Sequence, residues 1–162
     1  MRPDKWDLRF LRMAHHVSGW SKDQSTQCGA VLARNRRVLS TGYNGFPPGV
    51  NDAELRYHER PMKYFMTEHA ERNAIYNAAR HGVSTDGATC YVFGLHPCSR
   101  CVRAMLAAGV ACCVFGYDSD EHPDGKSPHM DPMDFEAAAD MLGDIKEVYY
   151  VARPTLWWAA KE

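Results

Sequence analysis

The 162-residue sequence has no long apolar run, no excess of charge of one sign, and no internal repeat or low-complexity tract. Residues 1–6 lack the apolar core of a secretory signal peptide, and no later stretch approaches the length of a membrane span. The net charge of −1 leaves no basic footprint of the kind that holds a long phosphate backbone. These absences argue against a secreted protein, a membrane protein and a binder of long nucleic acids.

The composition is that of an ordinary globular protein. Apolar residues make up 45% of the chain and charged residues 24%, which excludes a disordered chain. The length suits a single packed core, so we expect residues 1–162 to form one domain. Without a signal peptide the expected location is the cytoplasm, where the six cysteines stay reduced and act as metal ligands or core residues. Cys112 and Cys113 lie in an apolar run and are expected in the core.

Hydrophobic periodicity predicts an alternation of helices and strands. A first helix with an apolar stripe ends near Gly19, and two short strands follow with a turn at Asn35 and Arg36. The remaining expected helices cover residues 69–80, 98–108 and 131–142, and the remaining strands 89–93, 110–115 and 147–151. This order predicts an α/β fold in which helices enclose a five-stranded, partly parallel sheet.

The segments between these elements carry weaker signals. Three glycines and two prolines in residues 42–49 predict a shaped loop without regular structure. Residues 50–63 are expected to form a loop with some helix, and Thr67 is a candidate N-cap for the helix that starts near His69. We expect an exposed loop at 118–130, and we expect the apolar residues 156–158 to pack on the body or on a neighbouring subunit.

Two short stretches carry the chemistry of the chain. His69-Ala70-Glu71 is followed by Pro97-Cys98-Ser99-Arg100-Cys101. One imidazole and two thiols are ligands that zinc prefers, and a catalytic zinc site uses three protein ligands and one water. A structural zinc site closes with four protein ligands, and no fourth cysteine or histidine stands at a natural spacing. His69, Cys98 and Cys101 are therefore predicted to hold a catalytic Zn²⁺.

Glu71 is the acid and base that such a site needs. Both stretches lie at expected helix N-termini, where exposed backbone N–H groups favour negative charge and therefore thiolates. Two thiolates cancel the formal charge of the zinc, so a water beside it needs a dedicated base more than it would with three imidazoles. Glu71 is expected to move protons from that water to a ring nitrogen and to the leaving amino group. An H-x-E stretch followed by P-C-x-x-C is the known signature of zinc-dependent nucleobase deaminases.

Residues 18–117 resemble the deoxycytidylate (dCMP) deaminases of the cytidine deaminase superfamily. The zinc motif alone marks the superfamily, and additional motifs point to the deoxycytidylate branch. The matching residues are Ser21-Lys22-Asp23, Gly29-Ala30-Val31, Gly42-Tyr43-Asn44-Gly45-Phe46-Pro47 with Gly49, His69-Ala70-Glu71 with Asn73-Ala74-Ile75, and Pro97-Cys98 with Cys101.

The resemblance implies a three-layer α/β/α sandwich with a central five-stranded mixed sheet. It implies hydrolysis of dCMP to dUMP and ammonia in a homo-oligomer, a hexamer or a dimer. By the same analogy Asn44 contacts the sugar or base of the substrate, and the Ala70 backbone contacts the pyrimidine.

The resemblance also implies regulation. Many members are activated by dCTP and inhibited by dTTP, the triphosphate binding together with Mg²⁺. The residues that this implies for the effector site are Lys22, Asp23, Tyr43, Asn44 and Gly45.

Several features depart from the family pattern or have no assignment. Arg72 stands in the H-A-E-x-N stretch where an apolar residue is usual, and His96 precedes Pro97; both are close enough to the motif to change substrate preference. Some relatives bind a second, structural zinc, for which Cys28, His58 and His81 offer only an arbitrary spacing. The candidates for the substrate phosphate are Lys22, Arg56, Arg60 and Arg103.

Two alternatives to a dCMP deaminase stay open. The chain could be a zinc deaminase of another cytosine nucleoside, a free base or a modified cytidylate. From a different class, it could be a non-catalytic zinc module, although such a module has no need of an acid two residues from a ligand. A metal assay combined with a panel of cytosine substrates separates these alternatives.

Overall fold

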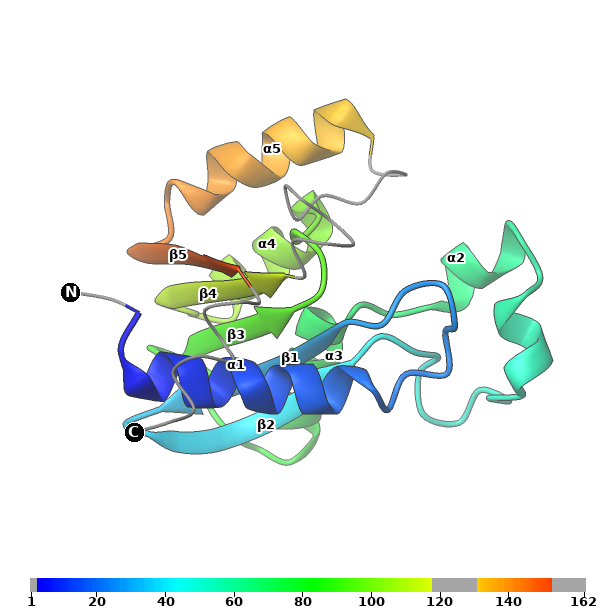
Figure 1. The fold of residues 1–162 in the computed structure, drawn as a ribbon, viewed down its shortest axis with the longest axis horizontal. Helices are drawn as coiled ribbons and strands as arrows, with labels where there is room; N and C mark the ends of the chain where they lie inside the picture. The colour runs from blue at the N-terminus through cyan, green and yellow to red at the C-terminus, as the bar shows by residue number, and fades with distance from the viewer. Residues whose placement is uncertain (1–2, 118–130, 153–162) are drawn as a thin grey trace.

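The computed structural model describes residues 3–117 and 131–152. Five strands form one sheet in the order β2-β1-β3-β4-β5 (Figure 1). The strands are β1 (Gly29–Arg34), β2 (Arg37–Tyr43), β3 (Thr89–Phe93), β4 (Cys112–Tyr117) and β5 (Glu147–Ala152). β1 runs antiparallel to both β2 and β3, whereas β3, β4 and β5 are parallel to one another. The predicted mixed five-stranded sheet is confirmed.

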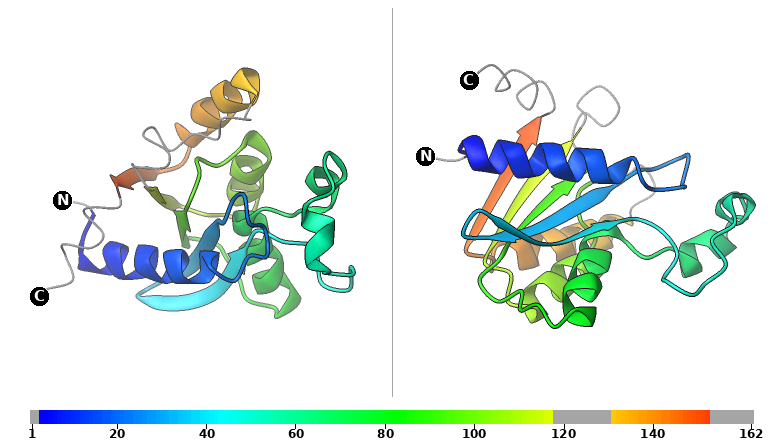
Figure 2. Two further views of the ribbon diagram at one scale, coloured as in Figure 1. Left: turned by 45° about the vertical axis from the view of Figure 1, so that its right-hand side comes forward. Right: turned by 90° about the horizontal axis from the view of Figure 1, so that it is seen from below.

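Helices cover both faces of the sheet and complete a three-layer α/β/α sandwich. α1 (Lys5–Ser18) lies across one face, while α3 (Ala70–Arg80), α4 (Ser99–Ala107) and α5 (Pro132–Leu142) lie on the other (Figure 2). The apolar stripe of α1 packs on one side of β1 and β3 through Leu11 and Ala14. The larger core cluster, under α3, α4 and α5, contains Val102 and Met105 of α4. The predicted fold class is therefore correct.

Local sequence signals explain most of the element boundaries. Asp4 caps α1 through the backbone N–H groups of Trp6 and Asp7, and α1 ends at Gly19 as predicted. The turn between β1 and β2 places Asn35 and Arg36 at φ 54° and 61°. A two-residue hairpin with positive φ at both positions matches the twist of its strands. The predicted hairpin is confirmed.

Three predictions about the boundaries of helices, strands and loops need correction. Gly42 and Tyr43 belong to β2, so the irregular loop begins only at Asn44. Thr67 ends a short helix, α2 (Met62–Met66), because its backbone N–H bonds to the Lys63 carbonyl at 2.8 Å. The N-cap of α3 is His69. The strand expected at 110–115 begins two residues later, at Cys112, because the Val110 N–H still bonds to the Met105 carbonyl at the end of α4.

An arm formed by residues 47–67 extends away from the sandwich beyond the C-terminal end of β2 (Figures 1 and 2). It contains a 3₁₀ helix, η1 (Glu54–Tyr57), and α2, so the predicted loop with some helix is confirmed. Cys112 and Cys113 are buried as predicted. Among the described helices, none combines the length and apolarity needed to cross a bilayer. The loop expected at 118–130 and the tail residues 156–158 lie outside the described residues.

Candidate metal centre and active site

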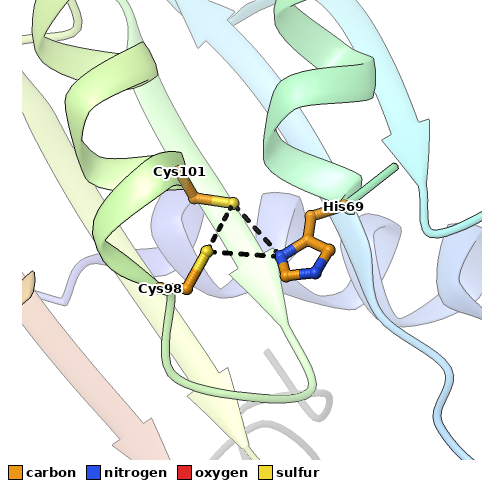
Figure 3. A group of neighbouring side chains, drawn as sticks. All are labelled: His69, Cys98 and Cys101. Carbon is orange, nitrogen blue, oxygen red and sulfur yellow. Dashed lines mark hydrogen bonds between the residues drawn. The ribbon is translucent and has the colours of Figure 1, made fainter. Parts of the chain in front are cut away.

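The N-termini of α3 and α4 bring the two chemistry-bearing stretches together (Figure 3). His69 is the N-cap of α3, Cys98 is the N-cap of α4, and Cys101 lies in the first turn of α4. The two helices lie side by side on the same face of the sheet. Residues about 30 positions apart in the sequence thus meet where two helix N-termini favour negatively charged ligands.

The three side chains have the spacing of a zinc site. Nδ1 of His69 lies 3.5 Å from Sγ of Cys98 and 3.4 Å from Sγ of Cys101, and the two sulfurs are 3.6 Å apart. Tetrahedral zinc with its usual bond lengths requires about 3.6 Å between nitrogen and sulfur and about 3.8 Å between two sulfurs. Both cysteines are buried, which keeps competing ligands away. The donor set and its spacing therefore fit zinc.

The pKa values of the two thiols, Cys98 and Cys101, are shifted in opposite directions. The hydrogen bond with Cys101 is the main reason that the pKa of Cys98 is lowered, to about 3, with His69 adding to the effect. The same hydrogen bond and burial raise the pKa of Cys101. The sulfur pair therefore retains one proton where two thiolates would repel each other. Metal binding displaces such a proton, which makes the metal affinity pH-dependent.

Glu71 lies beside the trio without belonging to it. It is the second residue of α3 and only 4% exposed. Burial raises its pKa above the usual value for a carboxyl group. The neighbouring His69 opposes this shift, and a hydrogen bond with the Cys101 side chain opposes it as well. A buried carboxyl with a raised pKa holds a proton more readily than an exposed one, which suits a group that must both accept and return a proton.

No second metal centre is found in the part of the chain that the structure describes. His69, Cys98 and Cys101 form the one group of three or more His, Cys, Asp or Glu side chains close enough to share an ion there. Cys28, His58 and His81 are therefore not brought together.

The two residues expected to contact the substrate, Asn44 and Ala70, are both buried. Ala70 is fully buried as the first residue of α3. The Asn44 amide accepts a hydrogen bond from the Cys28 N–H and donates one to the Thr26 carbonyl, both at 2.8 Å. Asn44 thus orders the segment that leads into β1. A direct contact between Asn44 and the substrate is a proposal.

The expected effector residues gather around the base of the arm. Lys22 pairs with Asp52 of the arm at 2.7 Å and is half exposed. Gly45 exchanges two backbone hydrogen bonds with Glu68, at 3.0 and 2.9 Å, and so connects the 44–46 segment to the residue before His69. Tyr43 is partly exposed and lies edge-on to Trp20.

Asp23 has a buried partner that the sequence does not reveal. Its carboxylate receives Lys63 Nζ at 3.0 and 3.1 Å, with both side chains less than 8% exposed. Burial opposes the charge, but hydrogen bonds from Ser25 and Lys63 overcome this, so the pKa of Asp23 is lowered. Lys63 thus fixes α2 to the segment after α1. A single lysine within the run Met62–Met66 does not reveal from the sequence that it is buried against Asp23.

The candidate phosphate cations fall into two places. Arg56 and Arg60 belong to the arm, where Arg56 donates to the Asn51 carbonyl and Arg60 to the Ser25 hydroxyl. Arg103 is exposed on α4, away from the arm. Near the metal ligands, His96 bonds through Nε2 to the Tyr150 hydroxyl at 3.1 Å and packs against Phe135. His96 thus connects the segment before Cys98 to β5 and α5.

Comparisons with known proteins agree with this centre. Residues 4–117 match the family described as the cytidine and deoxycytidylate deaminase zinc-binding region. An uncharacterised deaminase from the luxG 3′ region of Aliivibrio fischeri is 43% identical over 108 residues, covering 66% of this chain and 69% of the relative. A probable deoxycytidylate deaminase of Caenorhabditis elegans is 37% identical over 117 residues, covering 70% of this chain and 58% of the relative.

A solved structure shares the fold. The dCMP deaminase of the cyanophage S-TIM5, in complex with dCMP and dUMP, superimposes with a TM-score of 0.67 at 22% identity. The match covers 93% of this chain and 99% of the phage chain. At 22% identity this similarity shows that the two proteins share the α/β/α fold.

Proposed function

The chain belongs to the cytidine and deoxycytidylate deaminases, and from that membership we propose that it converts dCMP and water to dUMP and ammonia. One observation carries the proposal: an imidazole nitrogen and two sulfurs lie within 3.6 Å of one another beside the buried Glu71. The relative named a probable deoxycytidylate deaminase supports dCMP as the substrate.

In this proposal His69, Cys98 and Cys101 hold Zn²⁺, which supplies a Lewis acid that makes a water more acidic. Glu71 accepts a proton from the attacking water and delivers it to the pyrimidine ring nitrogen next to the amino-bearing carbon. The water oxygen bonds to that carbon, and Glu71 then carries the remaining proton of the attacking water to the amino group, so that the C–N bond breaks and ammonia leaves. The raised pKa of Glu71 suits both steps, because the group must be protonated and deprotonated within one turnover.

Substrate and effector residues complete the proposal. Asn44 and the Ala70 backbone contact the nucleotide. A triphosphate effector with Mg²⁺ binds at the base of the arm through Lys22, Asp23, Tyr43, Asn44 and Gly45. The two hydrogen bonds between Gly45 and Glu68 support a link from that region to the metal centre. We further propose one catalytic domain over residues 1–162, acting in the cytoplasm as a homo-oligomer, a dimer or a hexamer.

An ammonia-release screen tests the substrate. Cytosine, cytidine, deoxycytidine, CMP, dCMP and dCTP are compared at equal concentration with zinc-loaded protein. We expect kcat/KM for dCMP to exceed that for deoxycytidine by a hundredfold or more, because a charge-assisted phosphate clamp contributes on the order of 3 kcal/mol. Equal rates for the two compounds would indicate a nucleoside deaminase. Zinc binding without any deamination would indicate a non-catalytic zinc module.

A rate curve tests the regulation. The dCMP dependence should be sigmoidal, become hyperbolic with dCTP and Mg²⁺, and be depressed by dTTP, because each effector favours the conformation it binds more tightly. The variant Lys22→Gln should weaken the response of the rate to both triphosphates. Hyperbolic kinetics indifferent to both triphosphates would remove the effector site and leave the deaminase assignment standing.

A further inference from the structure

The turn between β3 and α4 carries the ligand Cys98, and a helix later in the chain holds this turn. Cys98 is the N-cap of α4, but its side chain caps no backbone N–H group of that helix. The first N–H group of α4, on Ser99, donates instead to Oδ1 of Asp134 at 3.1 Å. Asp134 lies in the first turn of α5, which packs against α4. A carboxylate 35 positions along the chain thus takes the place of an N-cap side chain.

The two sulfur ligands depend on the position of this N–H group. The first four N–H groups of a helix have no partner within it, and the side chain of the N-cap residue usually accepts one of them. A thiolate that binds a metal is directed at the ion and does not serve as that acceptor. Ser99 directly follows Cys98, and Cys101 lies in the same first turn. A shift of the Ser99 backbone therefore moves both sulfurs.

The start of the same turn is held through His96. Nδ1 of His96 lies 2.9 Å from the Pro97 carbonyl oxygen, and Nε2 lies 3.1 Å from the Tyr150 hydroxyl of β5. A carbonyl oxygen only accepts, so Nδ1 carries the proton and Nε2 accepts from the hydroxyl. The imidazole also packs against Phe135, with the ring centroids 4.7 Å apart. Phe135 directly follows Asp134, so the first turn of α5 contacts the chain on either side of the ligand.

We propose that Asp134 is a positioning residue for the two sulfur ligands, which it holds in place by capping α4 from α5. The inference rests on the proposed zinc site, and it adds α5 to the elements that form that site. Groups that fix the ligands of a metal site in their orientation strengthen metal binding, and their loss weakens it. The opposing view is that Asp134 only joins α5 to α4 and stabilises the fold to the same extent with and without a metal.

Zinc affinity tests the role of Asp134 without any substrate. It is measured by competition with a chromophoric chelator, well below the melting temperature of each variant. Asp134→Ala removes the acceptor for the Ser99 N–H and should weaken zinc binding by about 10- to 100-fold. Asp134→Asn keeps an acceptor oxygen, and asparagine and aspartate cap helices about equally well, so its affinity should stay close to that of wild type. Asp140→Ala removes an exposed carboxylate from the last turn of the same helix and should leave the affinity unchanged.

Two further measurements separate positioning from a purely structural contact. Co²⁺ in place of zinc has visible absorption bands that change with the angles between its ligands. Asp134→Ala should alter these bands, and Asp134→Asn should restore them. Asp134→Ala should also lower the unfolding free energy more in zinc-loaded than in metal-free protein, because binding to the folded state adds stability in proportion to its strength. A purely structural contact predicts equal losses in both forms, wild-type zinc affinity and unchanged cobalt bands.

Wild-type zinc affinity in Asp134→Ala overturns the inference, and so does an Asp134→Asn protein that binds zinc as weakly as Asp134→Ala. If Asp134→Ala does not fold, Asp134→Ser replaces it, because serine is well tolerated at helix N-termini. The serine hydroxyl lies one bond closer to the backbone than the carboxylate oxygen does, so it should not reach the Ser99 N–H. The same loss of zinc affinity is expected, and wild-type affinity in Asp134→Ser refutes the proposal.

The deamination assay keeps this inference separate from the proposed function. If wild-type protein binds zinc and the variants differ as expected, but no cytosine compound is deaminated, the proposed function fails and the role of Asp134 stands. If wild-type protein binds no zinc, the metal site fails and this inference fails with it.

Discussion

Replacement of Gly42 by alanine should disturb the metal centre from the opposite side of α3. Gly42 lies in β2, directly under the first turns of that helix. A Cβ built at this position would lie 2.3 Å from Ala74 N and 2.4 Å from the Ala70 carbonyl oxygen, both backbone atoms. Ordinary carbon contacts begin near 3.4 Å, so the helix would have to move by about 1 Å. Overpacking of this kind costs typically about 1–3 kcal/mol.

The displaced segment is the one that carries Glu71 and follows His69, so function should suffer beyond the loss of stability. In a chain of this size each kcal/mol lowers Tm by about 2–4 °C, which predicts a fall of roughly 2–12 °C. A misplacement of about 1 Å near reacting groups can cost on the order of a hundredfold in rate. We expect Gly42→Ala to melt earlier and to deaminate dCMP far more slowly even where it remains folded.

Gly45→Ala is the matched control, three residues along the chain. The atoms nearest to a Cβ at Gly45 belong to the Tyr43 and Tyr57 side chains, at 3.4 Å or more, which is ordinary van der Waals contact. Thermal melting and kcat are measured for both variants at equal zinc and protein concentration, because bound metal raises apparent stability. If Gly42→Ala matches wild type in both quantities, the close approach of β2 to α3 does not constrain the site, and the reasoning is wrong.

Three further outcomes are expected. Glu71→Gln should keep one zinc per chain by metal analysis yet lose about 10²- to 10⁴-fold in kcat, since it removes the proton carrier and no ligand; substantial activity in that variant would rule out the mechanism. Cys98→Ala should bind zinc weakly and melt earlier than wild type, and chelator-treated wild type should approach the same Tm; a stoichiometric zinc content in Cys98→Ala would contradict the ligand assignment. Lys63→Met should destabilise the fold by about 3–5 kcal/mol at pH 7 in denaturant unfolding, because it leaves the buried Asp23 charge without its partner. The pKa of Asp23 is lowered in the folded state, so the stability that its charge contributes is present above pH ~4 and is lost as the pH falls below that value. The difference in unfolding free energy between Lys63→Met and wild type should therefore become smaller on acidification. A difference that does not change with pH would exclude this ion pair as the cause.

Much of the fold could be read from the sequence because its signals are local. The apolar stripe of α1, the turn at Asn35 and Arg36, and the β-rich run at 89–93 each involve neighbouring residues, and each element appears where it was expected. The prediction for Thr67 was wrong because two neighbouring helices, α2 and α3, compete for the same residue as a boundary. Thr67 looks like an N-cap, but its N–H closes α2, and its hydroxyl has no hydrogen-bond partner among the described residues.

The chemistry of the centre was likewise determined by the sequence. The spacing of H-x-E and C-x-x-C selects the ligand types and places both stretches at helix N-termini, which are local properties. Only the tertiary structure brings His69 within 3.5 Å of the two sulfurs, because that requires α3 and α4 to pack side by side on one sheet face. The Lys63–Asp23 pair joins residues 40 positions apart, and the buried Nε of Arg72 depends on the packing around α3. Burial and long-range contact decide these features, and neither can be read from residue order alone.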